Sequence, residues 1–314
     1  MRLIICTIFE IFSIIVLKIK QARNRLYFVF FIDFLHFLGY NKLQLFFYFI
    51  KKLTQTITHS QKKFIGEIMK TIITILFILL FFIIGYPLLG FFWIYRKINP
   101  YQADLCQLRI VQSALRVMQF FSGSKLTVLG EENVPKDEAV LYVANHRSMY
   151  DIVYTYSRTP RLTGYISKSG VLKVPALRAW MKRLHCLFLD RDDIKQGLKT
   201  ILSAIDLVKN DISICIFPEG TRNRDTENSA SLLEFKDGSF KIAQKTGCKI
   251  IPIAITGTNN IFEAQFPWIK KSHVILEYGK PILYSELSAE EKKKIGAHFQ
   301  GIIGGMLEGH KELL

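Results

Sequence analysis

The chain has 314 residues, of which 50% are hydrophobic, and it carries 42 basic against 26 acidic residues, a formal net charge of +16. That length can bury one substantial core and still supply membrane-directed sequence. The positive balance favours an anionic partner, such as nucleic acid, a membrane surface or a phosphorylated substrate. The five cysteines are widely spaced and include no CxxC pair, which excludes a disulfide framework and predicts reduced thiols on the cytosolic side.

Residues 1–68 form an N-terminal extension whose apolar runs, 3–17 and 27–39, are too short or too interrupted to predict a spanning helix. The interrupting side chains are Glu10, Asp33 and His36. No small-residue pattern follows the first run, so it does not resemble a cleaved signal peptide. Because Met69 stands directly before a long apolar run, a gene-start artefact is an alternative to a native segment here. We expect a chain that begins at Met69 to insert in membranes and to keep its full function.

Residues 69–97 are predicted to be a membrane anchor. Their central part, 72–94, has no charged residue, and at ~1.5 Å rise per residue a helix of this length spans a hydrocarbon core of ~30 Å. Aromatic and basic residues at its end mark an interface. The residues expected to kink the helix are Gly85, Pro87 and Gly90. A buried core helix is the alternative. The segment can span the membrane or be re-entrant, and because lysines lie on both flanks, charge does not decide its orientation.

Residues 98–314 are predicted to form one α/β domain. An amphipathic helix over 103–121 comes first, with apolar residues at three- and four-residue steps. After it, strands alternate with helices, which favours a largely parallel sheet flanked by helices. The predicted strands are 127–129, 139–144, 162–167, 186–189, 212–217, 249–255 and 274–278. The predicted helices among and after them are 194–209, 238–246 and 288–313.

The heptad NHRSMYD, residues 145–151, follows a predicted strand and precedes residues that can continue as a helix. If Ser148 is the helix N-cap, Asp151 takes the third helical position, and its side chain points back toward the turn that carries His146. A carboxylate there can fix the tautomer of the imidazole and stabilise the imidazolium that forms when the ring takes a proton. The pattern therefore favours a histidine base with an orienting acid.

Plainer interpretations of this heptad stay open. Ser148 and Asp151 also resemble a capping box with Asp in place of Glu, and His146 can be an ordinary polar turn residue. A zinc site needs three or four ligands, and no clustered set of His and Cys lies nearby in the sequence, so no metal site is predicted.

A second motif, FPEGTR at residues 217–222, also lies at the end of a predicted strand. Its Pro and Gly indicate a turn, so Glu219 and Arg222 lie on a loop beyond the strand, where open α/β sheets place ligands. Arg222 offers a planar fork suited to a phosphate. Glu219 can hold that arginine or accept from a substrate hydroxyl. A surface turn with a local ion pair is the alternative.

Two further stretches complete the pattern. LFLDRD, residues 187–192, places a charged pair after an apolar strand. IPIAI, residues 251–255, is a strand with Pro252 inside it, which is tolerated at a sheet edge or where a ligand replaces ladder bonding.

In this order the four stretches resemble the lysophosphatidic acid acyltransferase (1-acylglycerol-3-phosphate acyltransferase) family of the glycerolipid acyltransferase superfamily. NHRSMYD fits the family's N-H-x-x-x-x-D motif, and FPEGTR fits its phosphate-binding motif without a change. The resemblance covers about residues 128–282, with the hydrophobic lead-in from Met69 also in character, and it leaves out residues 1–68. One departure is His185, where the second motif of the family often has Gly ahead of the strand.

The resemblance implies transfer of an acyl group from acyl-CoA or acyl carrier protein to the free hydroxyl of a lysophospholipid, with no metal or prosthetic group. His146 is then the general base on the acceptor hydroxyl, and Asp151 orients it. Backbone N–H groups at the Ser148 helix start are expected to donate to the tetrahedral oxyanion. The implied substrate-binding residues are Asn145, Ser148, Lys168, Arg191, Glu219, Gly220, Thr221, Arg222 and Pro252. The implied location is the cell membrane, among membrane lipid, with the active site facing the cytoplasm.

Two other functions stay open. A related acyltransferase would act on glycerol 3-phosphate or a lyso-ornithine lipid, although Asp190-Arg191 resembles the lysophosphatidate branch more than the glycerol 3-phosphate branch. The charge of +16 also suits a membrane-tethered binder of nucleic acid or anionic lipid. Such a binder needs a dense basic face interleaved with exposed aromatics. The α/β part lacks that pattern, so no nucleic-acid partner is predicted.

Overall fold

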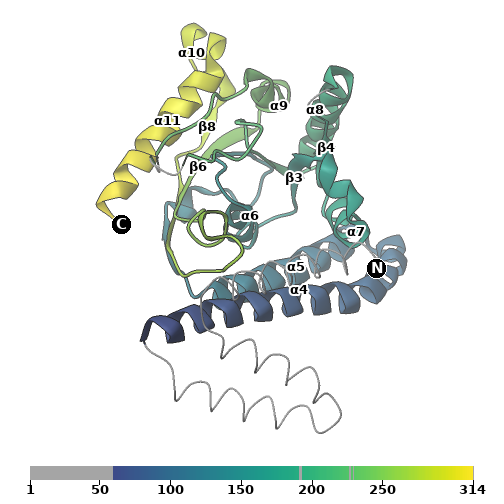
Figure 1. The fold of residues 1–314 in the computed structure, drawn as a ribbon. Helices are drawn as coiled ribbons and strands as arrows, with labels where there is room; N and C mark the ends of the chain where they lie inside the picture. Colours follow the sequence, from purple (N-terminus) through teal and green to yellow (C-terminus); the bar gives the residue numbers. More distant parts are fainter. Residues whose placement is uncertain (1–58, 191–192, 226–227, 229, 314) are drawn as a thin grey trace. The chain divides into compact units, whose positions relative to one another are not determined.

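A computed structural model describes residues 59–313 except 191–192, 226–227 and 229 (Figure 1). The chain divides into two compact units, residues 1–68 and residues 69–314. The predicted division into an extension, an anchor at 69–97 and a catalytic domain at 98–314 stays a prediction. The two apolar runs near the N-terminus, with Glu10, Asp33 and His36, lie outside the described residues.

An eight-stranded sheet is the centre of the second unit, in the order β1-β7-β6-β2-β5-β3-β4, with β8 paired to β6. All pairs are parallel except those that β6 forms with β7 and β8. The strands are β1 (Lys125–Leu129), β2 (Leu141–Ala144), β3 (Thr163–Lys168), β4 (Leu187–Leu189), β5 (Ser213–Ile216), β6 (Lys249–Thr256), β7 (His273–Tyr278) and β8 (Ile282–Leu283). The predicted α/β fold with a largely parallel sheet is therefore confirmed, with each predicted strand present and displaced by at most two residues at either end.

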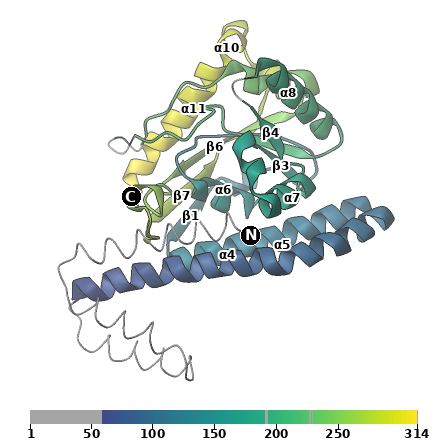
Figure 2. The ribbon, with the colours of Figure 1, turned by 45° about the vertical axis from the view of Figure 1, so that its right-hand side comes forward.

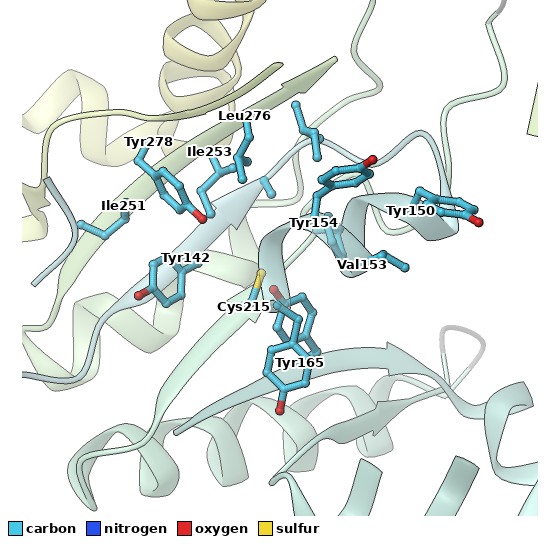
Figure 3. Close-up of a cluster of buried hydrophobic side chains, with 14 of the residues drawn as sticks. Tyr142, Tyr150, Val153, Tyr154, Tyr165, Cys215, Ile251, Ile253, Leu276 and Tyr278 are labelled. Carbon is cyan, nitrogen blue, oxygen red and sulfur yellow. The ribbon is translucent and has the colours of Figure 1, made fainter. Parts of the chain in front are cut away.

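Alternate residues of the central strand β2 point into two separate cores. Tyr142 and Ala144 join a core that packs against α5 (Pro100–Ser122) and α6 (Met149–Tyr156); Figure 3 shows this cluster. Leu141 and Val143 join the opposite core, which is covered by α8 (Ile194–Lys209), α9 (Lys241–Thr246) and α11 (Ile295–Gly309). Because helices cover both faces, every residue of β2 is buried and apolar, as is typical of parallel strands.

The C-terminal region differs from the prediction of one helix over 288–313. The structure has α10 (Ala289–Lys293) and then α11, with the break at Lys294. Gly296 at the start of α11 lies so close to the chain that a Cβ there would be 2.2 Å from the carbonyl oxygen of Phe235. Its N–H donates to Asp237 at 2.8 Å. The break thus lets α11 begin in direct backbone contact with the segment before α9.

The apolar run forms one helix, α4 (His59–Ile98), which continues through Pro87. Residues Phe64–Ile98 are long and apolar enough to cross a membrane. Length and composition alone also fit a buried core helix, but many of the large apolar side chains in this one are exposed. They are Phe64, Ile72, Ile73, Leu76, Leu80, Ile83, Ile84, Tyr86, Phe91, Trp93, Ile94 and Ile98.

Within the second unit α4 and α5 lie side by side (Figure 2). Asn99 caps α5, its side chain accepting from the backbone N–H of Gln102, and Pro100 begins the helix. At the far end Phe77 and Phe121 make an edge-to-face contact with ring centroids 5.7 Å apart. The two helices therefore form an antiparallel hairpin.

The helix α7 (Pro175–Arg183) was not predicted, because its nine residues are too few to show a clear helical period. Its one buried residue, Trp180, packs against Phe81 of α4 with ring centroids 5.4 Å apart. Gly85 allows this approach, since a Cβ there would lie 3.0 Å from the indole nitrogen of Trp180. The glycine thus lets α4 pack closely against the indole.

We expect Gly85→Leu to lower the thermal unfolding temperature and Gly90→Leu to leave it unchanged or raise it. Both changes add the same helix-favouring side chain to α4, but only Gly85 faces Trp180, while a Cβ at Gly90 meets nothing within 4 Å. Overpacking at the first site should cost about 1–3 kcal/mol. Equal unfolding temperatures for the two variants in detergent would show that the contact with Trp180 contributes nothing.

Candidate active site

Three neighbouring parallel strands, β5, β2 and β6, end at the same edge of the sheet. The segments that follow them are FPEGTR at residues 217–222, the heptad at 145–151 and a loop that begins at residue 257. Ligands of open α/β sheets bind at the carboxyl ends of the strands. The strand order therefore brings together the two motifs that the sequence predicted to act jointly.

The carboxylate of Asp151 is fully buried at the third position of α6. Its Oδ2 accepts from Nδ1 of His146 at 2.8 Å. The same oxygen accepts from the backbone nitrogens of Arg147, at 2.7 Å, and Ser148, at 2.8 Å. Its Oδ1 accepts from the hydroxyl of Thr258, at 2.5 Å. Ser148 and Asp151 also form a capping box, so the predicted cap and the predicted contact between Asp151 and His146 are both present.

The imidazole of His146 is fixed from two directions. Its Nδ1 bonds Asp151, and its ring stacks on Phe217 with centroids 4.2 Å apart and planes 20° apart. A carboxylate only accepts, so Nδ1 carries the hydrogen and Nε2 keeps a lone pair in the neutral ring. No described residue hydrogen-bonds to Nε2, and the side chain is 16% exposed. Nε2 is therefore free to take a proton from a bound group.

Glu219 has a different role from the predicted one. Its buried carboxylate accepts from the backbone nitrogen of His146 at 2.7 Å and from that of Leu233 at 2.9 Å. The backbone nitrogen of Asn223 donates to the carbonyl of His146 at 2.7 Å. Burial raises the pKa of Glu219, while the two backbone donors oppose this rise. With both oxygens engaged and 4% of the residue exposed, Glu219 does not hold Arg222; that prediction was wrong.

Arg222 instead pairs with a residue that the sequence did not single out. Its Nη1 donates to Oε1 of Glu263 at 2.9 Å. The same carboxylate accepts from the backbone nitrogen of Met149 at 2.7 Å and from the hydroxyl of Ser148 at 2.5 Å. The helix-start N–H groups are thus occupied, that of Ser148 by Asp151 and that of Met149 by Glu263. The expectation that they stand ready for an oxyanion is therefore not met in this structure.

Three other predicted binding residues lie near these groups. The amide of Asn145 is buried and exchanges two hydrogen bonds with the backbone of Ile255, at 2.9 and 2.8 Å, so it extends the pairing of β2 with β6. Gly220 has φ 69°, a left-handed conformation that glycine adopts at no cost. Thr221 beside it is exposed. The glycine thus turns the loop so that Glu219 and Arg222 make separate contacts.

The structure places Pro252 and Lys168 away from the histidine. Pro252 is buried in the middle of β6 opposite Val143, so it does not lie at a sheet edge. Its missing N–H falls where the antiparallel partner of β6 changes from β8 to β7. Lys168 ends β3, two strands from β2, and its side chain is exposed. Arg191 lies outside the described residues.

Sequence reasoning missed Thr258, Glu263 and Lys236. Thr258 closely follows β6, and the carboxyl end of a third parallel strand was a usable signal for it. Nothing in the sequence indicated Glu263. The end of the Lys236 side chain lies over Gly220, where an added Cβ would be 3.5 Å from its Nζ. Among the described residues no group of three or more His, Cys, Asp or Glu could hold a metal ion.

The comparisons with known proteins find similarity to acyltransferases. The family model described as Acyltransferase matches residues 125–256. A 1-acyl-sn-glycerol-3-phosphate acyltransferase of Borreliella burgdorferi is 31% identical over 156 residues, 49% of this chain and 60% of that protein. A chloroplastic 1-acyl-sn-glycerol-3-phosphate acyltransferase of Arabidopsis thaliana is 32% identical over 187 residues, 59% of this chain and 49% of that protein. The chain thus spans less than two thirds of the length of both relatives.

The fold also has a counterpart of known structure. The crystal structure of the 1-acyl-sn-glycerophosphate acyltransferase PlsC from Thermotoga maritima superposes with a TM-score of 0.65. The match covers 79% of this chain and 98% of that one, at 22% sequence identity. It supports the α/β architecture described above.

We expect Glu219→Ala to lower the free energy of unfolding by about 2 kcal/mol or more, because an unsatisfied buried donor costs about 1–3 kcal/mol and two N–H groups lose their acceptor. Glu219→Gln keeps one acceptor oxygen, so its free energy of unfolding should lie between that of Glu219→Ala and that of the unchanged chain. Denaturant unfolding measures the differences. Glu234→Ala, an exposed glutamate in the same segment, is the matched control and should have no effect. An unfolding curve of Glu219→Ala that superposes on that control would contradict this role.

Proposed function

We propose that this chain, which the Acyltransferase family model matches over residues 125–256, is a 1-acylglycerol-3-phosphate O-acyltransferase. It transfers a fatty acyl group from acyl-CoA or acyl carrier protein to the free hydroxyl of the acceptor and gives phosphatidic acid. The activity for which the relatives are named supports this acceptor. The observation that carries the chemistry is His146, with Nδ1 on a buried carboxylate and Nε2 unpartnered.

The proposed reaction uses His146 as a general base and then as a general acid. Nε2 takes the proton of the acceptor hydroxyl as its oxygen attacks the thioester carbonyl, and Asp151 stabilises the resulting imidazolium. When the tetrahedral intermediate collapses, the C–S bond breaks and His146 returns the proton to the leaving thiolate. The products are an oxygen ester and a free thiol, and the reaction needs no oxidant or metal. The thioester supplies the driving force.

Arg222 is proposed to bind the phosphate of the acceptor. It lies beyond the carboxyl end of β5, beside the strand that leads to His146. The side chain is 36% exposed, and Lys236 adds a second positive charge near the same loop. A guanidinium can donate to two phosphate oxygens at once, whereas the negative charge of a phosphate would repel a carboxylate side chain at this position. The roles of Lys168 and Arg191 stay predictions.

The proposed location is the cell membrane, with the active site facing the cytoplasm, where acyl donors are dissolved. The long helix Phe64–Ile98 supports an association with membrane lipid. A site held near the interface can meet a lysophospholipid whose acyl chain remains in the bilayer and whose headgroup projects from it. That arrangement suits an acceptor with one polar end.

The proposal is tested with membranes that contain the full chain. They are offered lysophosphatidic acid, glycerol 3-phosphate and a lyso-ornithine lipid side by side, each with acyl-CoA and with acyl carrier protein as donor. We expect transfer to lysophosphatidic acid at the highest kcat/KM. Preference for either other acceptor would assign the chain to that related activity, and transfer to none would refute the proposal.

We expect His146→Ala to lower kcat at least ~10²-fold, because a positioned base contributes ~10²–10⁴-fold. Asp151→Ala should lower kcat less, and it should also lower stability, because three backbone or hydroxyl donors lose their acceptor. Initial rates are measured beside the amount of protein in the membrane fraction. Retention of more than a tenth of the rate by His146→Ala would exclude its role as the base.

Arg222→Lys should raise the acceptor KM far more than the donor KM, because a point charge replaces a bidentate fork. Arg224→Lys makes the same change two residues away, at an exposed side chain, and should leave both KM values unchanged. Equal increases in both KM values for Arg222→Lys would remove it from the phosphate site.

A further inference from the structure

The carboxylate of Glu263 fills a position built for an anion. We propose that it is an internal competitor of the acceptor, which the acceptor phosphate must displace. This inference rests on the proposed function for the identity of the acceptor. The inference goes beyond that function by naming a residue that controls access to the site and excludes acceptors without a phosphate monoester.

Three donors from two different segments converge on this carboxylate. Met149 N, at 2.7 Å, and Arg222 Nη1, at 2.9 Å, donate to Oε1, and the hydroxyl of Ser148, at 2.5 Å, donates to Oε2. They combine the positive start of α6, an eight-residue helix, with a guanidinium from the loop after β5. All three can serve a phosphate oxygen equally well, since carboxylate and phosphate are both anionic and accept hydrogen bonds. Without an occupant, these donors would face water or the bound lipid unpaired.

Glu263 can leave this position without opening the protein. Its side chain is 24% exposed, and it lies on a single turn, Glu263–Gln265, in the loop between β6 and β7. The loop backbone is closed by its own hydrogen bonds, from Ile261 N to Thr258 O at 3.0 Å and from Lys270 N to Ile261 O at 2.9 Å. Displacement therefore needs a change of side-chain rotamer, with Thr258 still bonded to Asp151. The catalytic pair keeps its geometry while the anion position exchanges its occupant.

The competition gives selectivity by charge. A phosphate monoester carries a charge of about −1.5 to −2 at pH 7, against −1 for a carboxylate, and it has three strong acceptor oxygens. A phosphate can therefore replace Glu263 with a net electrostatic gain, and its terminal group can use all three donors. A zwitterionic or neutral headgroup brings no such charge and leaves Glu263 in place. Acceptors of that kind then meet a closed site.

The test titrates inorganic phosphate into the full chain in detergent by calorimetry. Glu263→Gln and Glu263→Ala are compared with the unchanged chain and with Glu290→Gln, which removes the same charge from an exposed position on α10. Both Glu263 variants should bind phosphate about three- to tenfold more tightly, since they lose a competing charge-assisted contact. Glu290→Gln should bind as the unchanged chain does. Adding Arg222→Gln to Glu263→Ala should abolish the gain.

Steady-state kinetics give the second readout. In the Glu263 variants the KM for lysophosphatidic acid should fall by a similar factor while the donor KM stays constant. Phosphate binding that is unchanged or weaker in both Glu263 variants would overturn the inference and make Glu263 a residue that positions Arg222. Because calorimetry needs no turnover, tighter phosphate binding in a chain that acylates no acceptor would support the displacement and refute the proposed function alone.

Discussion

The buried carboxylate of Asp151 is the constraint on which the site depends. A charge enclosed in a protein is tolerated only when hydrogen bonds replace its lost hydration. Here four donors do so, and they come from the imidazole of His146, the turn before α6 and the hydroxyl of Thr258 in the loop after β6. One ion thereby fixes the tautomer of His146, the first turn of a helix and the path of a loop. The imidazole needs no rearrangement before it can take a proton.

The parts of this arrangement that sequence could predict are local. His146 and Asp151 are five residues apart, so capping rules and the direction of helical side chains suffice to place them together. The central strands β2, β5 and β6 were predictable because both of their faces are buried and their runs are therefore apolar. The bonds of Glu219, Thr258 and Glu263 to the heptad join residues 73, 107 and 115 positions apart in the chain. Spacing rules contain no information about such pairs, and the sheet order alone brings them together.

The departure from the family pattern at His185 has a structural use. The residue takes φ 57°, a conformation that favours glycine, yet its Nε2 bonds Asp104 at 2.8 Å. Asp104 is buried near the start of α5 and also pairs with Arg96, at 3.3 Å, near the end of α4. Glycine could make the turn but could not make this contact. The histidine thus connects the turn before β4 to the helix hairpin that carries the exposed apolar surface.

The loop after β5 divides two tasks between residues three positions apart. Glu219 faces inward and binds the backbone of His146. Arg222 is partly exposed and binds the carboxylate of Glu263 at the start of α6. Gly220, in its left-handed conformation, reverses the chain between them. Substitutions at Glu219 should therefore act through stability and base position, and those at Arg222 through affinity for the acceptor. On the proposal that the acceptor phosphate displaces Glu263, the anion bound by Arg222 changes while Glu219 still holds the backbone of His146.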